Sequence, residues 1–140
     1  MHSAIDFQQL VNAVGDAIVV CDASGAITFW NPAAERLFGF AEQEALGRSL
    51  DLIIPERQRQ RHWDGYNKTM QTGQTRYGND VLRVPALHKD GRTLSIAFTV
   101  AMLFSAEHTV MAIIAIIRDE TARFSEERSL RKRLAELEGK

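Results

Sequence analysis

A stretch of strict alternation, from residue 93 to residue 104, limits the fold more than any other feature of this sequence. Large apolar side chains occupy every second position, and small or hydroxyl-bearing side chains separate them as far as residue 101. The apolar positions are Leu94, Ile96, Phe98, Val100, Met102 and Phe104. Because successive side chains of a β-strand point to opposite faces of a sheet, this pattern predicts a long strand with one buried face. The fold therefore contains a sheet that is covered on one side.

Four further stretches complete the predicted sheet. Residues 17–21 and 27–30 are short apolar runs separated by a turn signal, which predicts a β-hairpin. Residues 110–117 are apolar on both faces, as expected for a central strand. Residues 81–87 also have the composition of a strand, but Pro85 has no N–H to donate to a neighbour. Its presence predicts an edge strand or a bulge.

Helices are predicted between the strand at residues 27–30 and the strand at residues 81–87. Asn31 and Pro32 suit the N-cap and the first position of a short helix. A longer helix is predicted over residues 56–72, ended by Gly73. An antiparallel sheet with helices gathered on one face accommodates this order, so the predicted fold class is α+β.

The composition changes after Asp119. Charges of both signs alternate there, and Leu130, Leu134 and Leu137 share one helix face, which predicts a helical linker or the start of a coiled coil. The predicted segments are an N-terminal cap helix (residues 1–14), a core (15–121) and an exit helix with the coiled-coil start (122–140).

Charge and composition argue against several classes of protein. The 17 basic and 18 acidic residues give a net charge of −1, so no general attraction to nucleic acid or to an anionic membrane is expected. No apolar run approaches the roughly 20 residues of a membrane span. The single cysteine, Cys21, cannot form an internal disulfide, which suits a cytoplasmic protein. No catalytic constellation is visible, so we predict no enzymatic activity.

Short motifs occur in a fixed order along the chain. They are Ile27–Gly39 (ITFWNPAAERLFG), Ala45–Gly47 (ALG), Lys89–Gly91 (KDG) and Asp119–Thr121 (DET). Together they resemble the PAS family of sensory domains over about residues 5–121. The resemblance implies a five-stranded antiparallel sheet with short helices on one face, a side cavity and a C-terminal signalling helix. It also implies dimerisation and a role in signal transduction.

The long helix carries a second resemblance. From Ile54 to Gly91 the sequence aligns without a gap with the haem-binding PAS domains of rhizobial oxygen-sensing histidine kinases and of oxygen-sensor phosphodiesterases. This resemblance places His62 at the histidine that ligates the iron of haem b, and a neutral imidazole is a common haem ligand. It places Lys68 where the kinases have an arginine that pairs with a haem propionate. Tyr66, one turn after His62, is expected beside the ring or the haem edge.

The other side of the expected haem pocket departs from that pattern. Leu82 stands where the kinases have a distal arginine, and Asp80 stands where the phosphodiesterases have a methionine ligand. Strand alternation points the neighbouring Arg83 to the opposite face. Met102 is a candidate sixth ligand, although a methionine in a strand usually belongs to the core. The expected distal pocket consists of Leu82, Phe98 and Val100. This apolar set offers bound gas no hydrogen-bond donor, and therefore favours CO or NO over O₂.

Haem is one of three cofactor states that the sequence allows. Light-sensing flavin chemistry needs a cysteine in an Asn-Cys-Arg-Phe-Leu motif, which the sequence lacks, and Cys21 is interpreted as a small buried apolar side chain. A non-covalent flavin, or no cofactor, is the alternative to haem.

Three functions are compatible with these residues. The first is a haem-based gas or redox sensor, with a diatomic gas as its ligand. The second is a cofactor-free dimerisation and relay module that uses Phe7, Leu10 and the exit helix. The third is a receptor for a small molecule such as a carboxylic acid. In each case we expect a homodimer and an output domain such as a histidine kinase or another signalling effector.

Overall fold

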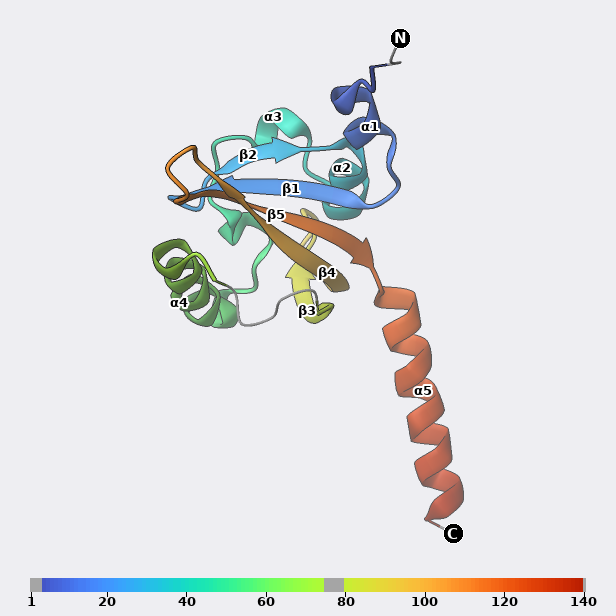
Figure 1. The fold of residues 1–140 in the computed structure, drawn as a ribbon. Coiled ribbons are helices and arrows are strands. Elements are labelled where there is room, and N and C mark those ends of the chain that lie inside the picture. Colours follow the sequence, from blue (N-terminus) through green and yellow to red (C-terminus); the bar gives the residue numbers. More distant parts are fainter. Residues whose placement is uncertain (1–3, 75–79, 140) are drawn as a thin grey trace.

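The computed structural model describes residues 4–74 and 80–139, and within this part five strands form one antiparallel sheet (Figure 1). The strand order is β2-β1-β5-β4-β3. The strands are β1 (Ala17–Asp22), β2 (Ile27–Trp30), β3 (Leu82–Leu87), β4 (Thr93–Phe104) and β5 (Val110–Asp119). The predicted α+β class is confirmed, as are the central position of the apolar strand β5 and the edge position of β3, the strand that contains proline.

The short helices cover one face of this sheet. The helical elements are α1 (Phe7–Ala13), α2 (Pro32–Phe38), α3 (Glu42–Ala45), the 3₁₀ helix η1 (Leu50–Ile53), α4 (Glu56–Thr72) and α5 (Thr121–Glu138). Buried residues of α2, α3, η1 and α4 form one core with the inward-facing residues of the strands. Among the residues that the structure describes, no helix combines the length and the apolar character that crossing a bilayer requires.

The buried face of β4 is the one that the alternation predicted, over most of its length. Leu94 and Ile96 are buried, and Phe98 packs at the margin of the core. Phe104, however, is 47% exposed, so the prediction that it lies on the buried face is wrong. It follows a register shift between Leu103 and Phe104, where β4 runs out of the packed part of the sheet.

Asn31, which is completely buried, connects three segments of the chain. Its Oδ1 accepts hydrogen bonds from the N–H groups of Ile18 (2.8 Å) and Ala34 (3.0 Å). Its Nδ2 donates to the carbonyl oxygens of Val11 (2.9 Å) and Asp16 (3.1 Å). The predicted N-cap of α2 therefore also fixes the start of β1 and the end of α1.

The edge strand tolerates Pro85 because of its register with β4. Pro85 lies opposite Ser95. The N–H of Ser95 donates to Thr121 Oγ1 (3.0 Å), and its C=O accepts from the N–H of Glu120 (2.8 Å), so both groups point away from β3. Pro85 and Ser95 are thus a non-hydrogen-bonded pair, and the missing N–H of Pro85 faces the free edge of the sheet.

The same contacts attach the exit helix α5 to the sheet. Thr121 accepts a hydrogen bond from β4 through its side chain, and its own N–H donates to Asp119 Oδ1 at 2.9 Å. Beyond this first turn α5 projects away from the sheet, and none of its residues is buried (Figure 1). A shift of β4 along its axis would therefore reach α5 directly.

Candidate cofactor site

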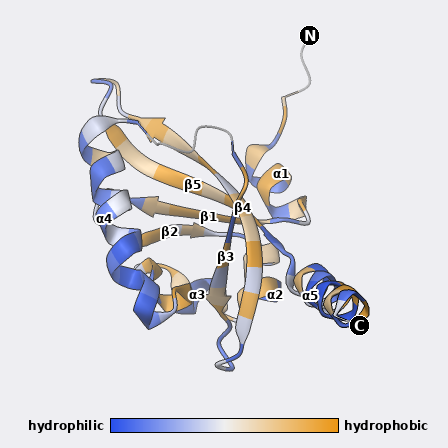
Figure 2. Cartoon of the chain, turned by 90° about the horizontal axis from the view of Figure 1, so that it is seen from below, coloured by the Kyte–Doolittle hydropathy of each residue, from blue (hydrophilic) through white to orange (hydrophobic). Residues whose placement is uncertain are grey.

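Helix α4, which carries the predicted iron ligand, is held in place by two of its aromatic side chains. Trp63 Nε1 donates to Asp51 Oδ1 of η1 (2.7 Å), and the Tyr66 hydroxyl donates to the carbonyl oxygen of Asp22 (2.5 Å). The Trp63 ring lies so close to Gly25, in the β1–β2 turn, that a Cβ at this position would overlap it. The rest of α4 is mainly hydrophilic (Figure 2). One side of α4 is therefore fastened to the β1–β2 turn, and the remainder meets solvent.

His62 lies beside these two anchors. Its ring packs edge-on against Trp63, with 4.5 Å between the ring centroids, and 5.8 Å from the ring of Tyr66. Its Nδ1 is buried and has no hydrogen-bond partner among the described residues. Burial lowers the pKa of His62, against an opposing effect of the nearby Asp51 carboxylate. The imidazole is therefore neutral near pH 7, which is the form that ligates iron.

The predicted distal residues lie together on the inner face of the sheet. Leu82 pairs with Phe98 across β3 and β4, and Val100 and Met102 follow on the same face, since side chains alternate along β4. All four side chains are half-buried. Within the described part of the chain, the packed core includes Phe98 but not Leu82, Val100 or Met102. The sheet therefore presents an apolar wall that the core does not fully cover.

Two predicted contributors are placed less favourably. Lys68 is exposed, and it lies two positions after the buried Tyr66, which puts it on the opposite side of α4 at about 100° per residue. The Tyr66 hydroxyl already donates to Asp22, so its phenol serves the packing of α4. The structure thus groups His62, Trp63 and Tyr66, and it groups the four wall residues, while Lys68 stands apart from both groups.

Cys21 is a buried apolar side chain, as the sequence suggested. Burial and the neighbouring Asp22 carboxylate raise the pKa of its thiol to about 12. The thiolate is consequently negligible at neutral pH, and a covalent reaction at Cys21 is not expected.

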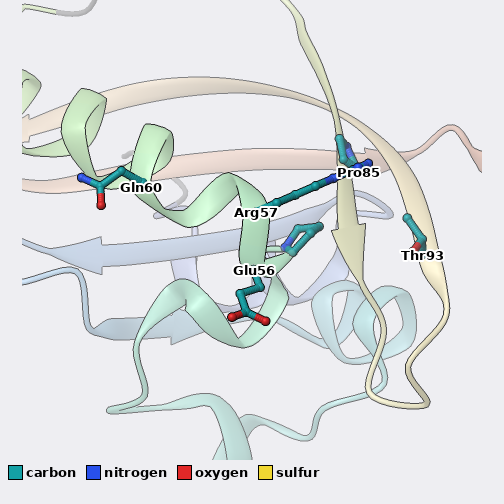
Figure 3. Close-up of a pocket in the computed structure, with 6 residues that line it drawn as sticks. Glu56, Arg57, Gln60, Pro85 and Thr93 are labelled. Atoms are coloured by element: carbon teal, nitrogen blue, oxygen red, sulfur yellow. The ribbon is translucent and has the colours of Figure 1, made fainter.

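A groove that no sequence pattern predicts lies beside the start of α4. Pro55, Glu56, Arg57 and Gln60 line one side, and Pro85 and Thr93 of the β3–β4 hairpin line the other (Figure 3). Its volume is about 780 Å³. Its two sides are about 30 residues apart in the chain, so they come together only through the docking of α4 beside the β3–β4 hairpin. The groove combines the Arg57 guanidinium, the Gln60 amide and the Thr93 hydroxyl with the Glu56 carboxylate, a mixed polar lining that suits a polar ligand.

The chain belongs to the PAS family, whose fold matches residues 5–119. Members of this family are generally sensory modules without catalytic activity. The predicted family is therefore confirmed.

Individual relatives carry sensor names. Sensor protein FixL of Bradyrhizobium diazoefficiens is 30% identical over 132 residues, covering 94% of this chain and 25% of FixL. Oxygen sensor protein DosP of Escherichia coli is 26% identical over 114 residues, covering 81% of this chain and 14% of DosP. A PAS domain of a Colwellia psychrerythraea protein has a TM-score of 0.73 at 23% identity, covering 83% of this chain and 95% of that one. The chain thus spans a quarter or less of the length of the two named sensors.

Proposed function

We propose that this chain is the sensory PAS module of a larger cytoplasmic signalling protein, and that it binds haem b through His62 to detect a diatomic gas or a change of redox state. The observation that carries this proposal is the neutral His62 imidazole with a buried, unpartnered Nδ1. The names of two relatives, a sensor protein and an oxygen sensor protein, support the same class of function.

The residues present fit a haem group in two respects. His62 supplies a neutral imidazole on a helix whose direction Trp63 and Tyr66 fix. The wall of Leu82, Phe98, Val100 and Met102 supplies apolar surface of the kind that a porphyrin face covers. When bound, haem supplies an iron centre with an exchangeable coordination position. Because this wall has no hydrogen-bond donor, we expect CO or NO to be held better than O₂.

The relay that we propose runs along β4. The wall residues Phe98 and Val100 stand on this strand, and Ser95, three residues before Phe98, bonds to the first turn of α5. Displacement of the wall by a ligand would therefore move the attachment point of α5. We propose that α5 passes this change to an output domain, such as a histidine kinase, within a homodimer.

An absorption spectrum tests the cofactor directly. Purified protein is incubated with hemin, freed from excess and compared with His62→Ala and with the matched control His108→Ala, since His108 is an exposed turn residue. We expect a Soret band in the wild type and in His108→Ala, loss of that band in His62→Ala, and its return when free imidazole is added. A band that is equally strong in His62→Ala would show that His62 is not the ligand.

The groove next to α4 favours a second candidate function, a receptor for a small anionic molecule. Arg57, Gln60 and Thr93 offer donors there, beside the carboxylate of Glu56, and they lie on α4 and the β3–β4 hairpin. A thermal-shift screen with simple carboxylates tests this candidate. Stabilisation that Arg57→Ala removes, in protein without a Soret band, would favour the receptor over the haem sensor.

A further inference from the structure

A second groove lies at the end of the sheet where α5 begins. Figure 1 shows the start of β1, the end of β5 and helix α2 side by side there, with α4 on the other side of the domain. The register of the sheet sets Ala17 of β1 opposite Ile117 of β5, so the residues just before Ala17 and just after Ile117 meet at this end. This exit groove is lined by residues 15–17, by residues 33, 36 and 37 of α2, and by residues 117–119. It is therefore distinct from the wall proposed for haem and from the groove beside α4.

The bottom of the exit groove is apolar. Ala17, Ala33 and Ile117 are buried, and Leu37, one turn after Ala33 on α2, packs at the margin of the core. The groove has a volume of about 320 Å³, which is at the lower end of the range for ligand pockets. Its size and its apolar bottom therefore suit a small ligand with a short hydrocarbon part.

Four charged side chains also line the exit groove, and their charges sum to zero. Asp16 and Arg118 pair with each other, since the Nε and one terminal nitrogen of Arg118 each lie 3.3 Å from a different carboxylate oxygen. Arg36 of α2 and Asp119 of β5 are the other two. Neither of these forms an ion pair with any residue that the structure describes. One guanidinium and one carboxylate are thus left for a ligand.

This pair of opposite charges at a neutral groove favours a ligand that carries both charges itself. A simple anion would be attracted to Arg36 and repelled by Asp119, and a simple cation would meet the reverse. An α-amino acid offers a carboxylate to the guanidinium and an ammonium to the carboxylate, while its side chain covers the apolar bottom. From this lining we infer that the exit groove binds an α-amino acid with a small apolar side chain, such as valine.

Asp119 connects the exit groove to helix α5. Its Oδ1 accepts a hydrogen bond from the N–H of Thr121, the first residue of α5, at 2.9 Å. A ligand ammonium at Asp119 would share that carboxylate with Thr121, so binding would act on the first turn of α5 without passing through α4. The role of α5 as output rests on the proposed function, but binding at the exit groove does not depend on haem.

A titration with L-valine, followed by the amide chemical shifts of isotopically labelled protein, tests the site and its ligand. For a ligand of this size we expect a Kd on the order of 0.1–1 mM. The shifts should concentrate at residues 15–17 and 117–121, including the amide of Thr121. N-acetyl-L-valine lacks the ammonium and L-valinamide lacks the carboxylate, so each should bind about tenfold more weakly. Equal binding of all three compounds, or shifts confined to residues 55–60, would overturn the inference.

Two charge-removing substitutions test the assigned contacts. Arg36→Gln and Asp119→Asn should each weaken L-valine about tenfold, and the second keeps an amide oxygen that can accept from the N–H of Thr121. Arg48→Gln is the matched control, because Arg48 is exposed and outside the groove, and the change removes the same charge as Arg36→Gln. An affinity for L-valine that neither Arg36→Gln nor Asp119→Asn reduces would refute the assignment.

A blocking substitution at Gly15 provides an independent measurement. A Cβ at this lining residue would meet no other atom within 4 Å, and the φ of Gly15 is not in the left-handed region, so a larger side chain causes neither overlap nor strain there. Gly15→Leu should therefore stay folded and lose the L-valine shift at Thr121, and an undiminished shift would contradict the inference. All titrations use colourless protein without hemin, so a missing Soret band refutes the haem proposal without touching this one.

Discussion

Replacing Asn31 by alanine should destabilise this domain severely, although the change removes only a small side chain. In the structure the amide serves two backbone donors, Ile18 N–H and Ala34 N–H, and two backbone acceptors, the carbonyls of Val11 and Asp16. Alanine would leave the N–H of Ile18 without its partner in a buried place. The N–H of Ala34 would keep its hydrogen bond to the backbone carbonyl of residue 31, which lies 3.0 Å away.

The expected loss follows from these separate contacts. An orphaned buried donor costs about 2 kcal/mol, and the lost side-chain N-cap of α2 costs about 1 kcal/mol. The two carbonyls are partly buried and together add about 1 kcal/mol. The free energy of unfolding should therefore fall by about 4 kcal/mol, out of a total on the order of 5–15 kcal/mol for a domain of this kind. The melting temperature should fall by about 10–20 °C.

Urea unfolding, followed by the fluorescence of Trp30 and Trp63 and by circular dichroism, measures this loss. Asn31→Asp is the informative companion, because its carboxylate keeps both acceptor contacts but faces two carbonyl oxygens. Its penalty relative to wild type should shrink as the pH falls, since a protonated carboxyl can donate to one of those carbonyls. A loss below about 1 kcal/mol for Asn31→Ala, at unchanged denaturant dependence, would refute the account of Asn31 as the link between α1, β1 and α2.

Three further predictions concern the site and the relay. Tyr66→Phe removes the bond to the Asp22 carbonyl while keeping the ring, so the free energy of unfolding should fall by about 1 kcal/mol in denaturant titrations; an unchanged value would mean that this bond does not anchor α4. Thr121→Val removes the acceptor for Ser95 N–H, and hydrogen exchange should become faster at the start of α5 but not in Thr121→Ser. Burial lowers the pKa of His62, so the unfolded chain binds more protons than the folded one below about pH 6.5, the ordinary value for histidine. The contribution of the neutral His62 to the free energy of unfolding is thus complete above that pH and is lost as the pH falls. In urea titrations, His62→Gln should lose less stability than the wild type between pH 7.5 and pH 5.5. An equal loss in both proteins would exclude His62 as the cause.

Features that depend on residues close together in the sequence were predictable from it. The inward set of β4 from Leu94 to Met102 follows from a period of two, and α4 ends at Gly73, whose φ of 69° suits glycine. Pro85 correctly indicated an edge strand. The prediction that Phe104 is buried failed because alternation contains no information about where a register shift ends the regular part of a strand.

Contacts between distant residues could not be predicted in the same way. The bond from Tyr66 to Asp22 joins residues 44 apart in sequence, and the bond from Trp63 to Asp51 joins residues 12 apart. Both depend on where α4 docks, which the pattern of a single helix does not specify. Asn31 makes one contact that the sequence predicts and one that it does not. Its N-cap bond was predictable from the Asn-Pro pair, while its bond to Val11 depends on the placement of α1.

The edges of the sheet restrict how this domain can associate. At one edge, Pro85 leaves β3 without a donor at its middle, and at the other edge β2 is four residues long. An extended strand from another chain would find few backbone groups to bond with at either edge. The domain is thereby protected from edge-to-edge polymerisation, even at high local concentration. Any association of this domain would therefore use side chains on helices or on sheet faces, where small changes of sequence can select one partner and reject others.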